Sequence, residues 1–254
     1  MDIGSINIKV VLLDNNGAIV AQTTARSGYS GREVAMQLIV RLLTETNLDD
    51  RDIVSTVATG YGRFNFPAAC QVTEITCQAL GISHLYNEAR TVIDIGGQDS
   101  KIIKLTPGGK VADFIMNDKC SAGTGRFLEV MSGALEIKLE DMGRFVDEAK
   151  GHCTISSFCT VFAESEVVSH VAAGVPKADI IAGICESVAS RVASMVLRIG
   201  LEAEVVFTGG VARNKGVVTA LIKHLDCGLL VPELPEISAA LGAALFARSM
   251  SSTP

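Results

Sequence analysis

The sequence is poor in residues that mark disordered, membrane-bound or nucleic-acid-binding proteins. It has no tryptophan, only six prolines in 254 residues, and 20% charged residues with a net charge of −6. It contains no run rich in lysine and arginine, so we expect neither a nucleic-acid surface nor one for anionic membranes. The 48% hydrophobic content argues against disorder and predicts well-buried cores.

Targeting signals and paired cysteines are also missing. The first residues lack the basic and apolar regions of a secretory signal, so we expect a cytoplasmic protein. Seven cysteines fit a reducing compartment, and their odd number and the lack of a Cys-x-x-Cys pair disfavour a disulfide framework or zinc ribbon. The longest apolar tract, around 180–197, is broken by Glu186 and Arg191, which predicts a buried helix rather than a membrane span.

Two common nucleotide-binding signatures are absent as well. There is no Gly-x-x-x-x-Gly-Lys-[Ser/Thr], which excludes a P-loop, and no Gly-x-Gly-x-x-Gly after a predicted strand, which disfavours a Rossmann site. Any nucleotide site must therefore be built differently.

What the sequence does contain is an internal repeat. Residues 2–9 and 94–101 both read Asp-Ile-Gly-small-x-x-x-Lys, and two β-branched residues follow each octamer. Each then leads into a predicted strand, a turn (Asn-Gly or Pro-Gly-Gly) and a second strand. Two copies in matching register predict a duplicated strand–loop–strand unit.

These two loops suit phosphate binding. Glycine lets backbone N–H groups approach a phosphate closely, a serine hydroxyl can donate to it, and lysine can neutralise it. An aspartate at each strand end can hold Mg²⁺ through its water ligands. Two ordinary glycine-turn hairpins are the simpler alternative, but the shared Asp and Lys favour phosphate sites. The expected nucleotide-binding residues are Asp2, Gly4, Ser5, Lys9, Asp94, Gly96, Gly97, Gln98 and Lys101, with Asp2 and Asp94 also expected to hold Mg²⁺.

A third glycine site follows the predicted strand 204–208. A strand, two glycines and a helix start form a junction that can bind a nucleotide, although a tight strand-to-helix turn explains it equally well. The expected nucleotide-binding residues here are Gly209, Gly210, Arg213 and Asn214. For hydrolysis, Gln98 or Asp99 is the best candidate to orient the attacking water, and a simple contact with phosphate or Mg²⁺ explains Gln98 equally well.

The order of predicted elements indicates two α/β lobes. The first spans residues 1–90 and the second 91–235, and residues 236–254 are expected to return to the first lobe as a helix. The predicted helices include 33–46, 180–199 and 237–247, and the predicted strands include 53–58, 91–95 and 204–208.

Five segments, in this order along the chain, resemble a known group of proteins. Two phosphate loops and a late Gly-Gly junction are similar to the actin/sugar-kinase/Hsp70 superfamily. Together the segments closely resemble the ATP-dependent activators of 2-hydroxyacyl-CoA dehydratases and the related ATPase subunits of benzoyl-CoA reductase. The resemblance implies duplicated actin-like (ribonuclease H-like) ATPase lobes with a nucleotide cleft between them. The segments are Thr59–Arg63, Asp94–Lys101, Asn117–Glu129, Cys159–Glu166 and Phe207–Asn214.

The resemblance also implies cofactors and partners. It implies ATP or ADP with Mg²⁺, and a homodimer that holds one [4Fe–4S] cluster through Cys120 and Cys159 of each subunit. Hydrolysis of ATP would drive transfer of one low-potential electron to a partner iron–sulfur dehydratase or reductase. Cys153, six positions before Cys159, stays open as an alternative ligand. A small-molecule kinase of the same fold, or an actin-like scaffold, would leave Cys120 and Cys159 unexplained.

The residues after each of these two cysteines have helical spacing. We therefore expect each thiolate at a helix N-terminus, where the dipole and free N–H groups favour negative charge. From spacing alone, however, an apolar core role explains both cysteines better. Two cysteines cannot complete a four-thiolate site, so this interpretation requires twofold symmetry.

The sequence departs from the family pattern near its start. Met1 directly precedes Asp2, where an apolar strand is usual, so we expect a stub of a strand and either a start upstream or a poorly supported loop. Residues 6–8, Ile-Asn-Ile, replace hydroxyl-rich residues, which predicts fewer side-chain donors to phosphate.

Overall fold

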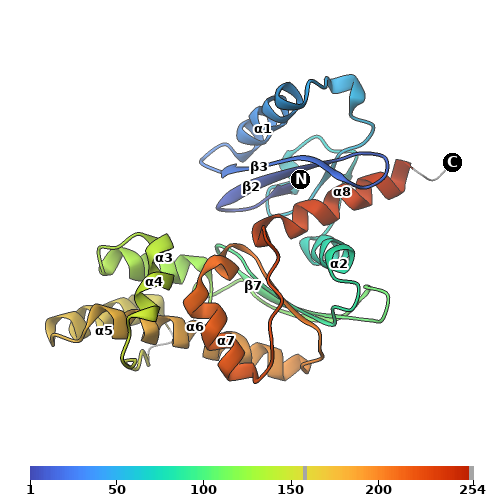
Figure 1. Cartoon of the computed structure of the whole chain (residues 1–254). Helices are drawn as coiled ribbons and strands as arrows, with labels where there is room; N and C mark the ends of the chain where they lie inside the picture. Colours follow the sequence, from blue (N-terminus) through green and yellow to red (C-terminus); the bar gives the residue numbers. More distant parts are fainter. Residues whose placement is uncertain (157–158, 252–254) are drawn as a thin grey trace. The chain divides into compact units, whose positions relative to one another are not determined.

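The computed structural model describes residues 1–156 and 159–251, and it divides the chain into two compact units (Figure 1). The first unit comprises Met1–Arg90, Leu105–Ala112 and Glu236–Pro254, and the second comprises Thr91–Lys104 and Asp113–Pro235. Residues 105–112, expected in the second lobe, thus group with the first unit. There the turn at Gly109 lies against the side chain of Ser83.

The first unit is a small sheet with helices on it. Its strands β1, β2 and β3 pair antiparallel in that order, and the short β4 and β5 pair in parallel. The elements are β1 (Asp2–Ile3), β2 (Asn7–Leu13), β3 (Ile19–Arg26), α1 (Gly31–Thr46), β4 (Val57–Ala58), β5 (Cys70–Gln71), α2 (Glu74–Leu85) and α8 (Ser238–Ser251).

Two apolar clusters stabilise this unit. Leu38 and Leu42 of α1 pack with Ile8 and Val10 of β2 on one face of the sheet. On the other face α8 runs along β2 and beside α2, as Figure 1 shows, and its alanines pack on Val57. Small residues on α8 allow this close approach.

The second unit has a four-stranded sheet and most of the helices. The strand order is β8-β7-β6-β9, with β6 antiparallel to β7 and parallel to β9. One apolar core joins Ile93 and Phe207 of the sheet to Phe127, Ile184 and other helix residues. The elements are β6 (Thr91–Ile95), β7 (Ser100–Leu105), β8 (Val111–Asn117), α3 (Gly125–Ala134), α4 (Met142–Asp147), α5 (Thr160–Ala172), α6 (Lys177–Ile199), β9 (Val205–Thr208) and α7 (Lys215–Leu225).

The long apolar tract forms α6, as predicted. Its length and composition would suffice to cross a membrane, but 61% of its most apolar window is buried inside the structure. Ile184, Val188 and Val192 are fully or almost fully buried in the core of the second unit. The prediction of a buried core helix is therefore confirmed.

The predicted strand 53–58 is wrong for most of its length, because only Val57–Ala58 are in a strand. A short 3₁₀ helix, Asp50–Asp52, precedes Ile53 instead. Asp49 is its N-cap, and the side chains of Asp49 and Asp52 form a capping box. The neighbouring strand β1 has only two residues, as the predicted stub implied, and the Met1 amine bonds to the Val57 carbonyl at 2.8 Å. Of residues 53–56, Thr56 bonds through its carbonyl to the Ala69 N–H at 2.9 Å, just before the paired residues of β4 and β5.

The crossing of α2 and α8 is held close by a glycine on each helix. A Cβ on Gly242 would collide with the carbonyl group of Cys77, and one on Gly81 would collide with the carbonyl oxygen of Ser238. Neither obstacle is a flexible side-chain end, so the helices would have to separate to accommodate a methyl group.

We predict that Gly242→Ala lowers the free energy of unfolding by about 1–3 kcal/mol, because overpacking displaces backbone. Denaturant unfolding followed by circular dichroism measures this. Gly133→Ala is the matched control: it lies in helix α3 with no atom within 4 Å of the added Cβ. The control should be neutral or slightly stabilising. Equal destabilisation by both variants would contradict the packing argument.

Candidate functional site

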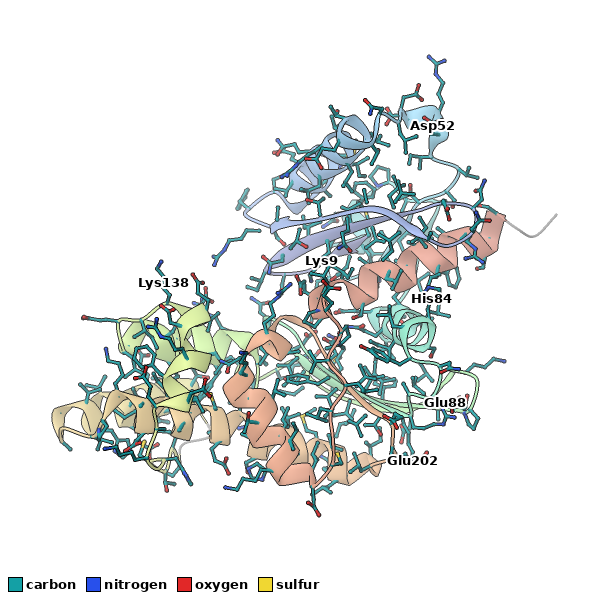
Figure 2. All side chains as sticks on the ribbon, viewed as in Figure 1. Lys9, Asp52, His84, Glu88, Lys138 and Glu202 are labelled. Atoms are coloured by element: carbon teal, nitrogen blue, oxygen red, sulfur yellow. The ribbon has the colours of Figure 1, made fainter. Side chains whose placement is uncertain are left out.

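The two octamers form two hairpins of the same geometry. Asp2 is the cross-strand partner of Lys9, and Asp94 is the cross-strand partner of Lys101. In both pairs the lysine Nζ reaches the aspartate Oδ2, at 2.7 Å in the first (Figure 2 labels Lys9) and 3.4 Å in the second. The repeat in sequence is thus a repeat in structure.

The turns are also closed in the same way. Gly4 N–H donates to the Asn7 carbonyl at 3.1 Å, and Gly96 N–H donates to the Asp99 carbonyl at 2.9 Å. A Cβ on Gly4 would lie 2.7 Å from the Asn7 oxygen, and one on Gly96 would lie 2.6 Å from an Asp99 carboxylate oxygen. Glycine is therefore required at both positions for a steric reason.

The duplication also includes a Thr-Gly segment beside each aspartate, which the sequence analysis did not assign to the repeat. Asp2 bridges in parallel to Thr59, and Asp94 pairs in parallel with Thr208. In each case the next residue is a glycine with φ of 85° or 84°, whose missing Cβ would meet the aspartate Oδ1. The shared Thr-Gly after a strand, at 59–60 and 208–209, was the signal that could have revealed this.

The two loops differ in how far their charges are already neutralised. In the first, Asp2 is buried and, within the described residues, its Oδ1 accepts no hydrogen bond. In the second, Lys101 is almost completely buried and pairs with Asp99 at 2.8 Å as well as with Asp94. A buried carboxylate oxygen without a donor fits an expected contact to a water of Mg²⁺.

The two candidates for positioning water occupy different environments. Asp99 is buried and ion-paired with Lys101, so its carboxylate is already engaged. Gln98 is exposed at the tip of the loop. Ser5 is likewise exposed at the tip of the first loop. Exposure leaves the amide of Gln98 and the hydroxyl of Ser5 accessible to a bound ligand.

The third glycine site is a strand, a 3₁₀ turn and a helix. Gly209 N–H and the Thr208 hydroxyl both donate to the Pro235 carbonyl, at 3.0 and 2.6 Å. The turn then spans Gly210–Arg213, with Gly210 and Arg213 exposed. Asn214 uses its Oδ1 to cap α7, accepting from two backbone N–H groups at 3.0 and 3.2 Å. The cap occupies Oδ1 only, and within the described residues the buried Nδ2 of Asn214 has no hydrogen-bond partner.

Cys120 does not lie at a helix N-terminus, contrary to expectation. It sits in a turn five residues before α3, whose N-cap is Thr124. Asn117 organises this turn: its Nδ2 donates to the carbonyls of Cys120 and Ala122 at 2.8 and 3.1 Å, and its Oδ1 accepts from Cys120 N–H at 3.2 Å. Asparagine bonds to nearby backbone compete well with helix formation, which explains the late start of α3.

Cys159 does lie at a helix N-terminus, as predicted. It is the N-cap residue of α5, with its carbonyl accepting from Ala163 N–H at 2.9 Å, and its side chain is exposed. Upstream, Glu166 of α5 accepts from the backbone N–H and hydroxyl of Ser156. Ser156 is thereby tied to helix α5.

A side-chain hydrogen bond joins the two cysteine segments. The hydroxyls of Ser121 and Thr160, the residues directly after Cys120 and Cys159, lie 2.8 Å apart. Two segments 39 residues apart in sequence thus meet at the residues that directly follow the two cysteines. Within residues 1–156 and 159–251, no group of three or more Cys, His, Asp or Glu side chains could hold a metal ion. Two cysteines per chain fit a cluster only if a second copy supplies the rest.

The other cysteines have a different chemistry. Burial raises the pKa of the Cys77 thiol to about 11 and that of Cys185 to about 12, so both stay protonated at neutral pH. Burial also raises the pKa of Cys153. The Cys153 sulfur packs against the backbone of Gly183 on α6, where a Cβ would lie 3.1 Å from it. This packing is typical of a structural cysteine.

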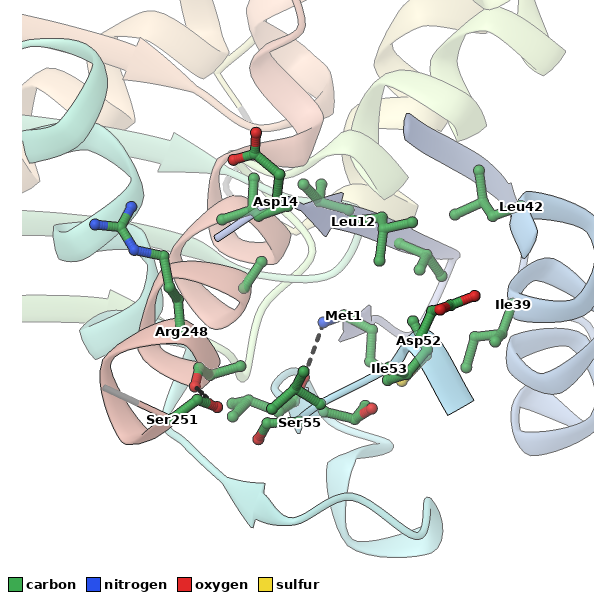
Figure 3. Close-up of a pocket in the computed structure, with 18 of the residues that line it drawn as sticks. Met1, Leu12, Asp14, Ile39, Leu42, Asp52, Ile53, Ser55, Arg248 and Ser251 are labelled. Atoms are coloured by element: carbon green, nitrogen blue, oxygen red, sulfur yellow. Dashed lines mark hydrogen bonds between the residues drawn. The ribbon is translucent and has the colours of Figure 1, made fainter. Parts of the chain in front are cut away.

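The first unit also contains a cavity of about 420 Å³ beside Met1, shown in Figure 3. Its walls come from the ends of β2 and α8, with Leu12, Asp14 and Arg248, and from the segment before β4. None of the described residues that line it belongs to the glycine loops Gly4–Lys9 or Gly96–Lys101. It is therefore distinct from the phosphate-binding candidates.

Comparison with known proteins decides the family. Residues 1–247 match the BadF/BadG/BcrA/BcrD ATPase family. The chain belongs to this family. It is 48% identical to the activator of lactoyl-CoA dehydratase of Anaerotignum propionicum, over 97% of this chain and 95% of that protein. It is 46% identical to the 2-hydroxyisocaproyl-CoA dehydratase activator of Clostridioides difficile, over 97% of this chain and 93% of that protein.

A solved structure agrees with this assignment. The activator of the 2-hydroxyisocaproyl-CoA dehydratase from Clostridium difficile, with bound ADPNP, superposes with a TM-score of 0.94 at 45% identity. The likeness covers 98% of this chain and 93% of that one. The predicted actin-like ATPase fold and the predicted family resemblance are both confirmed.

We predict that the cluster-free native protein is alkylated by iodoacetamide at pH 8 quickly at Cys159 and very slowly at Cys77 and Cys185. Cys159 is exposed, whereas the other two are buried and keep their protons below their raised pKa values. Peptide mass spectrometry over time measures the rates. Unfolding in urea is the control and should make all seven cysteines reactive. Fast native labelling of Cys77 or Cys185 would contradict the burial.

Proposed function

We propose that this protein is an ATP-hydrolysing iron–sulfur activator that donates one electron to a partner 2-hydroxyacyl-CoA dehydratase. The observation that carries the proposal is the Ser121–Thr160 hydrogen bond, which brings the segments of Cys120 and Cys159 together. A small-molecule kinase of the same fold would leave Cys120 and Cys159 unexplained. The relatives at 46% and 48% identity are named as activators of such dehydratases.

The glycine loops are proposed to bind the phosphates of ATP. In the first, Gly4 lets the backbone turn tightly, the exposed Ser5 offers a hydroxyl donor, and Lys9 offers positive charge next to Asp2. The second offers the equivalent Gly96–Gly97 backbone. Asp2, with its free carboxylate oxygen, is the stronger candidate to hold Mg²⁺ through water, and Asp94 is its structural counterpart. The exposed residues Gly210 and Arg213 of the third glycine site are proposed to contact the nucleoside.

Gln98 is proposed to orient the water that attacks the γ-phosphate. Phosphoryl transfer depends on positioning and charge stabilisation more than on covalent chemistry, and an exposed amide at the loop tip can both accept from and donate to water. Asp99 is proposed instead to fix Lys101, with which it forms a buried ion pair of 2.8 Å.

Cys120 and Cys159 of two copies are proposed to hold one [4Fe–4S] cluster, which when bound supplies a one-electron carrier. The chain contributes the setting: Asn117 holds the Cys120 turn, and the N-terminus of α5 places free N–H groups beside Cys159. Backbone donors near thiolate sulfurs and solvent exposure both tune a reduction potential.

We predict that Lys9→Met weakens MgADP binding at least about tenfold, because one charge-assisted hydrogen bond contributes about 1.5–3 kcal/mol. Isothermal titration calorimetry measures the change. Lys104→Met is the control, since this lysine of β7 belongs to neither glycine loop and pairs instead with Glu202 at 2.6 Å. The control should bind within about twofold of the unchanged protein. Equal affinity in all three proteins would exclude Lys9 from the nucleotide site.

We also predict that anaerobically purified protein is a brown dimer with about four irons per dimer. Cys120→Ser and Cys159→Ser should each abolish the iron, because serine does not replace a thiolate ligand well, and dehydratase activation should be lost with it. Iron analysis and native mass spectrometry provide the readout. Cys153→Ser is the matched control and should retain iron. An iron-free wild type, or iron loss only in the control, would overturn the proposal.

A further inference from the structure

The second phosphate loop is hydrogen-bonded directly to the loop that carries Cys120. The Ser100 hydroxyl donates to the Gly123 carbonyl at 2.5 Å. Gly125 N–H donates to the Gly96 carbonyl at 2.9 Å, and Arg126 N–H donates to the Gly97 carbonyl at 2.8 Å. The first turn of α3 therefore rests on the carbonyls of the same glycines that are proposed to face phosphate.

This contact is dry and tightly packed. Ser100 and Thr124 are completely buried, so water does not compete for these hydrogen bonds. A Cβ on Gly125 would lie 3.1 Å from the Gly96 carbonyl oxygen. On the other side, Gly123 has φ of 83°, and a Cβ there would lie 3.0 Å from the Arg191 side chain. Neither loop can shift far without the other.

The internal repeat shows that the hairpin itself does not need the Ser100 hydroxyl. The equivalent position of the first octamer is Ile8, a fully buried core residue of β2 with no side-chain donor. Both hairpins nevertheless have the same Asp–Lys register and the same glycine turn. The hydroxyl of Ser100 therefore serves something other than the hairpin, and within the described residues it donates to the Gly123 carbonyl of the cysteine loop.

The connection continues to both thiols. Gly123 is three residues after Cys120, inside the turn that Asn117 organises. Ser121 then bonds to Thr160 next to Cys159 at 2.8 Å. A continuous path of short hydrogen bonds thus runs from the phosphate loop to both cysteine segments, entirely within the second unit.

We propose that Ser100 is a positioning residue that transmits the nucleotide state of the second phosphate loop to the cluster cysteines. This inference rests on the proposed function. Gain or loss of the γ-phosphate changes the contacts of the Gly96–Gly97 backbone. Through Ser100 and the first turn of α3, that change moves the Cys120 loop and hence the surroundings of the cluster. Ser100 itself touches neither the nucleotide nor the iron.

The test uses the iron-loaded dimer and two nucleotides, MgADP and the analogue ADPNP with Mg²⁺. The rate of iron capture by bathophenanthroline disulfonate reports how exposed the cluster is. In the wild type, ADPNP should change this rate relative to MgADP. In Ser100→Ala, that change should shrink by about fivefold, the factor corresponding to loss of one hydrogen bond. Iron content and affinity for both nucleotides should stay within about twofold.

The controls separate this inference from the proposed function. Ser132→Ala removes a buried hydroxyl that bonds only within α3, to the Glu129 carbonyl at 2.9 Å, and should keep the full nucleotide response. If Ser100→Ala does not fold, Ser100→Cys repeats the test with a side chain of similar size and a weak donor. A wild type without iron would refute the proposed function. An iron-loaded wild type that does not respond to nucleotide, or a Ser100 variant that responds fully, would overturn this inference.

Discussion

The structure depends on the pairing of an aspartate with a lysine across a hairpin whose turn begins with glycine. This arrangement fixes where the carboxylate lies, where the ammonium group lies, and which backbone N–H groups face outwards between them. It occurs twice, with the same register and the same turn bond. A Thr-Gly segment pairs in parallel with each aspartate, and its glycine lies close to the aspartate Oδ1. Each unit is therefore organised around one phosphate-binding candidate rather than around a cavity.

The two copies of the hairpin differ in the surroundings of their charged side chains. In the first copy, a buried carboxylate oxygen of Asp2 accepts no hydrogen bond within the described residues, and Lys9 is partly exposed. These two groups suit the binding of a cation and a phosphate. In the second, Lys101 is buried between two aspartates, and Ser100 replaces the apolar residue of the first copy. Through Ser100, the second hairpin is hydrogen-bonded to the Gly123 carbonyl, close to the start of α3. The first hairpin has Ile8 at the equivalent position, which cannot form such a bond.

The seven cysteines illustrate how environment assigns chemistry to one residue type. Cys77 and Cys185 are held in apolar surroundings that raise their pKa values, so they act as small core side chains. Cys120 and Cys159 lie in segments bridged by a pair of hydroxyls, one in a turn held by asparagine and one at a helix N-terminus. Exposure and a helix N-terminus at Cys159 favour a thiolate, whereas burial keeps Cys77 and Cys185 protonated.

The sequence by itself determined the duplicated octamer, because hairpin turns and glycine positions are local patterns, and the resemblance of five of its segments to a known family implied the family and the actin-like fold. It also located α6 as a buried helix. It did not determine that Ile53–Thr56 lie outside a strand or that Cys120 sits in a turn rather than at a helix start. The repeated Thr-Gly at 59–60 and 208–209 is visible in the sequence, but its pairing with Asp2 and Asp94 is not. Those features, like the Ser121–Thr160 and Ser100–Gly123 bonds, join residues far apart in the chain. Only the tertiary structure decides such contacts, because they depend on how packed elements bring distant segments together rather than on the residues next to them in sequence.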